Sequence, residues 1–219
     1  MKRPEIYLEP KQRVAKIIEL LEKQYPDAKT ALNYSNPLEM LVATMLSAQT
    51  TDVRVNIVTK SLFNKYKTPE DYANADIKEL EQDIHSTGFY HNKARNLQKC
   101  CRMLVEKYRS HVPKTMDELL ELPGVARKTA NIVLNNSYGI IAGVAVDTHV
   151  HRLSQRLGLT ENEDAAKIEQ DLMQITPKEK WMKLTDLLIL HGRQVCIARK
   201  PKCEACVLNK ICPCAFTFG

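Results

Sequence analysis

The chain has 219 residues, of which 44% are hydrophobic and 26% charged, fractions typical of a globular protein with an apolar core. Lysine and arginine number 32 against 26 acidic residues, which gives a net charge of +6 that is compatible with a polyanionic partner. No window approaches the 18 uninterrupted apolar residues that a membrane span needs, and the low number of glycines, 7, argues against a β protein.

Helix start signals recur along the chain. Each combines an Asn, Thr or Asp that can cap a helix with a proline, an acidic residue or both in the next positions. Apolar residues follow at helical spacing, as in the first segment with Val14, Ile17, Ile18 and Leu21. The pattern predicts an all-α protein of about ten helices. The signals lie at residues 36–39, 68–71, 76–79, 115–118 and 176–179.

A tight turn is expected in the middle of the segment 119–130. Pro123 and Gly124 separate a short helix that ends near Glu121 from a second helix that begins near Val125 or Ala126. The N–H groups at the start of the second helix would form an anion site suited to a nucleic-acid phosphate. A plain connection between two helices is the alternative interpretation.

Lys128 falls in the first turn of that second helix. The helix dipole disfavours a cation there and favours the neutral amine, which is a nucleophile. Contact with a phosphate or with solvent is the alternative for this side chain.

About 20 residues later, an apolar run leads to Asp147 and His149. Asp147 is suited to cap a helix, and its carboxylate is also suited to stabilise a developing cation or to accept a proton. We interpret His149 as a packing residue that supports a site rather than as a catalyst.

Four cysteines lie within 17 residues near the end of the chain: Cys196, Cys203, Cys206 and Cys212. Thiolates with such short loops between them can surround one metal centre, either a zinc ion or an iron–sulfur cluster. The loops of six and five residues are long for a zinc finger, so we favour a [4Fe–4S] cluster. Two disulfides in a secreted protein are the less favoured interpretation of these cysteines, since no signal peptide is evident. We expect a reducing intracellular compartment. Cys214 is expected to be a bystander.

Together, these motifs resemble the endonuclease III family, helix-hairpin-helix DNA glycosylases with lyase activity. The resemblance rests on the segments 46–52, 122–129, 146–150 and 191–193 and on the cysteine run, in this order over nearly the whole chain. It implies two helical lobes with DNA bound in the cleft between them. A six-helix lobe would span residues 30–141, with the hairpin at about 119–136. Residues 1–29 and 142–219 would form the cluster lobe.

The resemblance also implies roles for single residues. Lys128 matches the Schiff-base lysine, Asp147 the catalytic aspartate, and Gln49 the residue that fills the space left by an extruded nucleotide. Ala126 stands where the hairpin usually has a second glycine, and its N–H can still donate to a phosphate if its φ is negative. Phe89 and Tyr90 match a second wedge loop that contacts DNA, although either residue is alternatively part of the core. The further DNA contacts are Leu122, Gly124, Ala126 and Thr129 in the hairpin and Arg193, Arg199, Lys200 and Lys202 beside the cluster. Ser47, Asp52 and His149 fall near the expected base pocket, and Asp52 is equally suited to be a helix-start acid.

The expected activity is removal of oxidised pyrimidines from double-stranded DNA, followed by β-elimination at the abasic site through the lysine. The expected protein is a monomer that binds damaged or abasic DNA, needs no membrane and holds the cluster mainly as an architectural group. Mismatch glycosylases for adenine or thymine are the nearest alternatives, although they tend to lack a lysine at position 128. A non-catalytic DNA-binding module is the alternative from another class.

Overall fold

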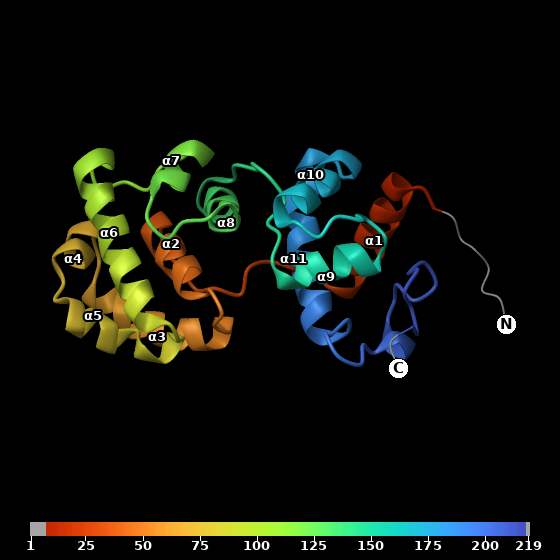
Figure 1. Cartoon of the computed structure of the whole chain (residues 1–219), viewed down its shortest axis with the longest axis horizontal. Coiled ribbons are helices and arrows are strands. Elements are labelled where there is room, and N and C mark those ends of the chain that lie inside the picture. The colour runs from red at the N-terminus through yellow and green to blue at the C-terminus, as the bar shows by residue number, and fades with distance from the viewer. Residues whose placement is uncertain (1–7, 218–219) are drawn as a thin grey trace. The chain divides into compact units, whose positions relative to one another are not determined.

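The computed structural model describes residues 8–217. Within them the secondary structure is helical, as predicted, with eleven α-helices and three short 3-10 helices (Figure 1). The α-helices are α1 Pro10–Gln24, α2 Pro37–Leu46, α3 Asp52–Lys65, α4 Pro69–Asn74, α5 Ile77–Asp83, α6 Tyr90–Tyr108, α7 Met116–Glu121, α8 Arg127–Tyr138, α9 Thr148–Arg156, α10 Ala165–Ile175 and α11 Trp181–Gln194. The 3-10 helices are η1 His85–Thr87, η2 Lys178–Lys180 and η3 Cys203–Ala205.

The chain divides into two compact units. Residues 31–142 form one, here called the middle unit, and the segments before and after them form the other, the terminal unit. The middle unit contains seven α-helices, α2 to α8, of which α4, α5 and α7 are short.

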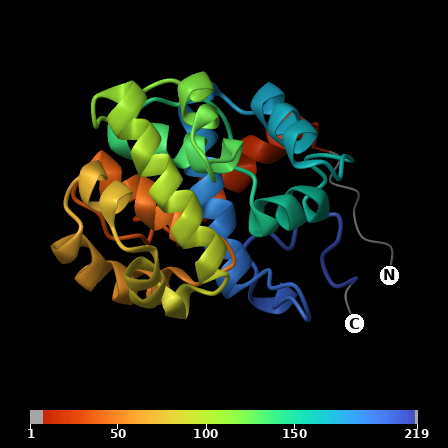
Figure 2. The same cartoon turned by 60° about the vertical axis from the view of Figure 1, so that its left-hand side comes forward.

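The middle unit is built around α6, its longest helix. This helix packs against α4, α5 and α2, and α2 also packs against α8 (Figures 1 and 2). Leu97, Cys100, Cys101 and Leu104 lie on one face of α6, and each is fully buried in the core. Burial raises the pKa of Cys100 to about 12, so its thiol is a neutral core group.

The terminal unit has a core of its own. The apolar residues of α1 predicted from their spacing, which include Val14, Ile17 and Leu21, are buried there against α10 and α11. Leu208 of the cysteine segment is also fully buried in this core. The cysteine segment therefore packs as part of the terminal unit. None of the helices between residues 8 and 217 has the length and apolar character needed to span a bilayer.

Most of the predicted helix starts are confirmed by side-chain caps. Asn36 caps α2, Asp76 caps α5 and Thr115 caps α7, each by accepting a backbone N–H of the first turn. Thr68 forms a complete capping box with Asp71 at the start of α4.

The helix start predicted at residues 176–179 is wrong. Thr176 is the C-cap of α10, and after the 3-10 turn η2 the next helix begins only at Trp181. The Thr176 carbonyl accepts the indole N–H of Trp181 at 2.9 Å, while its hydroxyl is buried with no hydrogen-bond partner in the structure. A threonine before a proline therefore marks the end of a helix here.

Candidate functional site

The hairpin between α7 and α8 has the tight turn that the sequence predicts. Leu122 is 2% exposed and packs in the core, and the Val125 N–H donates to its carbonyl at 3.1 Å. Gly124 has a φ of +80°, and a Cβ added to it would lie 2.9 Å from Cβ of Asn96. This position therefore requires glycine, both for its backbone conformation and for the close approach of α6.

Helix α8 begins without a side-chain cap. Its N-cap residue is Ala126, which has a φ of −94° and no side-chain oxygen to accept the N–H groups of the first turn. The other α-helices of the middle unit have a capping Asn, Thr or Asp, except α6, whose N-cap is Phe89. At both uncapped helix starts, α6 and α8, the resemblance places DNA contacts. Such a start is suited to an external anion.

Lys128 lies where the sequence predicts it, in the first turn of α8. Its side chain is half-buried rather than extended into solvent, as is the following Thr129. The residue thus belongs to the helix turn whose first N–H groups have no side-chain cap.

The Gln49 loop, residues 47–51, connects α2 to α3. Gln49 is exposed and has a φ of 53°, a left-handed conformation that is uncommon for a residue other than glycine. Ser47 is half-buried, with its hydroxyl donating to the Thr44 carbonyl at 2.8 Å. Asp52 is the first residue of α3, which favours its interpretation as a helix-start acid.

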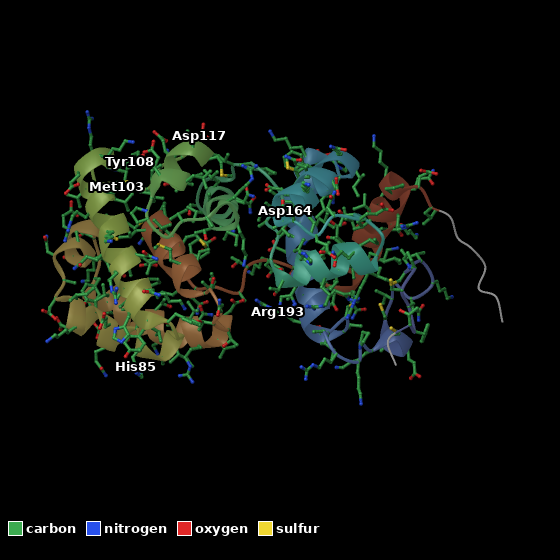
Figure 3. All side chains as sticks on the ribbon, viewed as in Figure 1. His85, Met103, Tyr108, Asp117, Asp164 and Arg193 are labelled. Carbon is green, nitrogen blue, oxygen red and sulfur yellow. The ribbon has the colours of Figure 1, made fainter. Side chains whose placement is uncertain are left out.

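The Phe89 loop, residues 84–89, leads into α6. Phe89 has a φ of 48° and is 65% exposed, whereas Tyr90 is half-buried against the core. The Tyr90 ring lies over His85, with 4.5 Å between ring centroids (Figure 3 labels His85). Of the two predicted wedge residues, Phe89 is the exposed one and Tyr90 is partly a core residue.

Asp147 caps α9. Its Oδ1 accepts the backbone N–H groups of His149 at 2.8 Å and Val150 at 2.9 Å, which holds the carboxylate in a fixed orientation. His149 is half-buried, and its Nδ1 lies 3.2 Å from the guanidinium of Arg152. Burial lowers the pKa of His149. These contacts agree with the interpretation of His149 as a packing residue.

The four cysteines of the C-terminal run line one cavity. Apolar groups including Leu153 and Leu157 complete its wall, and Cys214 also borders it. Burial raises the pKa of Cys212 to about 12, so thiolates in this apolar cavity need a positively charged centre to balance them. Among residues 8–217, no three His, Cys, Asp or Glu side chains converge on a single ion position. The cavity that the four cysteine side chains share is suited to an iron–sulfur cluster held by thiolates.

Two arginines of α9 hold the segment that leads into this cavity. Arg152 donates to the carbonyls of Gly192 and Cys196 at 2.9 and 3.0 Å. Arg156 donates to the Cys196 sulfur at 3.3 Å and to the carbonyls of Ile197 and Ala198. Sequence analysis did not single out these residues. Their spacing of four on one helix, with no acidic residue within that helix to pair with, is the signal that could have found them.

The predicted basic contacts surround the same segment on the surface. All four side chains are exposed, with Arg193 in the last turn of α11 (Figure 3). The residues are Arg193, Arg199, Lys200 and Lys202. Each is an exposed cation suited to a phosphate contact without sequence readout.

Sequence analysis also missed Lys93 of α6. It is only 9% exposed, and it contacts both the Gln49 loop and the residue Thr87 of the Phe89 loop. The signal for it was its spacing, because it shares a helix face with Leu97, Cys100 and Leu104.

Known proteins are similar to the chain over almost its whole length. The family model of the HhH-GPD superfamily base excision DNA repair proteins matches residues 42–178. The model of the iron–sulfur binding domain of endonuclease III matches residues 196–212, which begin and end at the first and last cysteines of the run.

Individual relatives agree with the family models. Endonuclease III of Synechocystis is 54% identical over 94% of this chain and 94% of its own length. Among solved structures, a non-covalent endonuclease III–DNA complex has a TM-score of 0.90 and 47% identity, covering 94% of this chain and 96% of that chain. A trapped endonuclease III–DNA covalent intermediate has the same TM-score and identity and covers 94% of this chain and 97% of that chain.

Proposed function

The chain belongs to the endonuclease III family of the HhH-GPD superfamily, and from this premise we propose how its own residues divide the work of base excision. Family membership makes it a DNA glycosylase with abasic-site lyase activity, with DNA as its partner and a [4Fe–4S] cluster as its cofactor. The proposals concern the lesion class, the catalytic residues, the cluster ligands and the DNA contacts.

We propose that the substrate is an oxidised pyrimidine in duplex DNA. Its sugar carbon is hidden in the base stack, so the nucleotide must be flipped out at a cost of a few kcal/mol. Gln49 fills the gap and bonds the orphaned partner base, and Phe89 enters the stack beside it. The exposed, left-handed positions of both residues support this assignment, because they project side chains that no core packing holds.

The backbone of the DNA is held by the hairpin and by the basic residues near the cysteines. The N–H groups at the uncapped start of α8 donate hydrogen bonds to one phosphate, and the Gly124 turn lets the DNA backbone approach closely. Ala126 takes part through its N–H, which its negative φ of −94° permits. Arg193, Arg199 and Lys202 add contacts to further phosphates.

The observation on which the catalytic proposal rests is the half-buried Lys128 in the first turn of the uncapped α8. The neutral amine of Lys128 attacks C1′ of the flipped sugar, and the damaged base leaves with the bonding electrons and a proton. Asp147 stabilises the positive charge on the sugar and helps to remove the proton from the amine. The resulting imine acidifies the C2′ proton, whose loss expels the 3′ phosphate and cuts the strand.

Cys196, Cys203, Cys206 and Cys212 are the proposed ligands of the cluster. Their common cavity and the apolar wall support this set, whereas Cys214 borders the cavity outside the spacing of the run. When bound, the cluster fixes the loop 196–212 and with it the neighbouring basic residues. Arg156 holds the same loop from α9.

Borohydride trapping tests the role of Lys128. The wild-type protein should form a covalent adduct with abasic DNA, and Lys128→Ala should form none, because no amine remains to be reduced onto the sugar. Lys128→Arg is the matched control, since it keeps the positive charge for phosphate contact but cannot form the imine. If Lys128→Arg cleaves abasic DNA as fast as wild type, Lys128 is a phosphate contact and the nucleophile assignment is wrong.

The same trap identifies the lesion class when it is run with several duplexes. Thymine glycol and abasic DNA should trap efficiently, and duplexes with uracil opposite guanine or adenine opposite 8-oxoguanine should trap poorly. Faster processing of either mismatch than of thymine glycol would assign the chain to a mismatch-specific branch instead.

A further inference from the structure

Lys93 is a buried ammonium group whose hydrogen bonds in the structure go to uncharged oxygens. Its Nζ donates to the Thr87 carbonyl at 2.7 Å, the Leu46 carbonyl at 2.8 Å and the Thr50 hydroxyl at 2.9 Å. A lysine has three N–H donors, so all three are used by these uncharged oxygens.

The three acceptor oxygens lie in or next to the Gln49 loop and the Phe89 loop. Leu46 is the last residue of α2 and Thr50 lies in the Gln49 loop, whereas Thr87 is the last residue of η1 in the Phe89 loop. The Thr50 hydroxyl in turn donates to the Thr87 carbonyl. One amine and one hydroxyl therefore tie the two loops together at their bases.

Both loops hold a residue in a strained conformation directly beside this tie. Gln49 and Phe89 have φ values of 53° and 48°, and left-handed conformations of such residues persist only when the surroundings impose them. Their side chains are exposed, so core packing does not impose the conformation. Backbone hydrogen bonds hold each loop by itself, such as Thr50 N–H to the Ser47 carbonyl and Asn92 N–H to the Phe89 carbonyl. The side chains of Lys93 and Thr50 add the contacts that join the two loops.

Burying the amine is unfavourable for the fold alone. Burial lowers the pKa of Lys93 to about 8, which reflects the desolvation of its charge. Its position at the C-terminal ends of α2 and η1 compensates for part of that cost, because a cation is favoured there. The ammonium group of Lys93 therefore hydrogen-bonds oxygens of the two loops rather than a carboxylate.

We propose that Lys93 is a positioning residue that couples the Gln49 and Phe89 loops, so that the two side chains enter the DNA stack as one unit. The inference rests on the proposed function, which assigns these side chains to the space around the flipped nucleotide. It adds that neither loop holds its inserting conformation independently of the other.

Lys93→Met tests the coupling, because methionine has similar length but no amine to donate to the three oxygens. Excision of a lesion in a stable, well-paired duplex should lose at least tenfold in kcat with a KM within about threefold of wild type. Strand cleavage at a preformed abasic site, where no paired base has to be expelled, should lose much less. A purely structural defect would reduce all substrates equally, and that pattern would overturn the proposal.

Lys99→Met is the matched control on the same helix, since Lys99 is exposed on α6. It should leave the ratio of excision to abasic-site cleavage at the wild-type value. Thr50→Val keeps Lys93 but removes the bridging hydroxyl. This variant tests the same coupling if Lys93→Met fails to fold. It should lower the same ratio with the folded fraction unchanged, and a normal ratio in folded Thr50→Val would overturn the proposal.

Gln49→Ala and Phe89→Ala, alone and together, separate this inference from the function on which it rests. In the wild-type background the double variant should lose little more excision than the worse single variant, because the side chains act together. Additive losses, unchanged in the Lys93→Met background, would show that the loops act independently and would overturn the coupling. If neither single variant affects excision, the assignment of Gln49 and Phe89 in the proposed function fails instead.

Discussion

At the scale of the residue, burial sets the protonation of several polar side chains. Lys93 and His191 are nearly inaccessible, and burial lowers the pKa of both, to about 8 and about 4. The His191 ring nitrogens lie 3.2 Å from the Tyr25 hydroxyl and 3.3 Å from the Cys206 sulfur, so the neutral ring is held by directional contacts. At Asp186 of α11 the same desolvation acts in the opposite direction and raises the pKa, because the charged form of an acid is the deprotonated one.

Burial raises the pKa of Asp186 to about 6, against an opposing effect of the Lys183 charge. An acid whose pKa is raised by folding contributes stability when it is protonated, and that contribution is lost as the pH rises through about 6. The ionised side chain therefore lowers the free energy of unfolding at neutral pH. The penalty grows by about 1.4 kcal/mol for each pH unit between the unfolded and folded pKa values.

Asp186→Asn should consequently stabilise the protein at pH 8 and lose about half of that advantage at pH 5. The expected gain at pH 8 is about 1–3 kcal/mol, measured by denaturant unfolding of the cluster-containing protein at both pH values. Asp117→Asn is the control, because Asp117 is exposed in the first turn of α7 and its carboxylate is favourable there (Figure 3). A gain at pH 8 that persists unchanged at pH 5 would contradict the proposed titration.

At the scale of the element, the hairpin combines two features that ordinary helix connections lack. The turn needs glycine at position 124, and the following helix begins with an alanine that cannot cap it. Most other helix starts in the middle unit are satisfied internally by side chains. An uncapped start behind a tight turn is a local instability that a bound phosphate removes.

Gly124→Ala should reduce both stability and DNA binding. The added Cβ would lie 2.9 Å from Asn96 Cβ and 3.1 Å from the Met45 methyl, at a φ of +80°. Gly139→Ala is the matched control, since Gly139 also has a positive φ, +66°, but open space around it. It should cost about 1–2 kcal/mol from the backbone alone. Gly124→Ala should cost more and should also weaken binding to abasic DNA, measured by fluorescence anisotropy.

Equal losses of stability in the two glycine variants would mean that α6 yields to the added carbon. In that case the close approach of α6 to the turn is not what fixes the hairpin. Normal DNA affinity in a folded Gly124→Ala variant would remove the turn from the proposed phosphate site.

The elements themselves were largely predictable because their signals are local. Asn36, Thr68 and Asp76 cap helices through the next three residues, so no tertiary information is needed. The sequence around Thr176 is similar, but Thr176 is buried at the end of α10, where tertiary packing determines that the helix ends. The position of Lys128 in a helix start followed from the Pro-Gly turn, and the resemblance supplied the role proposed for it.

Contacts between distant segments were beyond the reach of the sequence. Lys93 contacts residues 43 and 47 positions earlier, and Arg152 contacts a carbonyl 44 positions later. Their partners are mostly backbone oxygens, which every residue has, so no residue pattern identifies them. The left-handed conformations of Gln49 and Phe89 were also not predicted, because neither residue type favours them.

At the scale of the whole molecule, residues 8–217 form two hydrophobic cores. The core of the middle unit comes from one continuous segment, whereas that of the terminal unit combines α1 with residues from Val144 onwards. The cysteine segment joins the second core through Leu208 and through the arginines of α9. The cluster is therefore expected to stabilise the terminal unit in particular.

Cys212→Ser should lose the cluster, and Cys214→Ser should retain it, as measured by iron content and visible absorption. A serine oxygen is a poorer ligand than a thiolate for iron, whereas Cys214 is not among the proposed ligands. Cluster loss releases the loop 196–212, so hydrogen exchange should rise there and in α9, whose arginines bind this loop. Exchange in α2, α6 and α8 should stay within about twofold of wild type, since their core is separate. A similar rise in both units would show that the two cores unfold as one cooperative structure, and iron loss from Cys214→Ser would revise the ligand set.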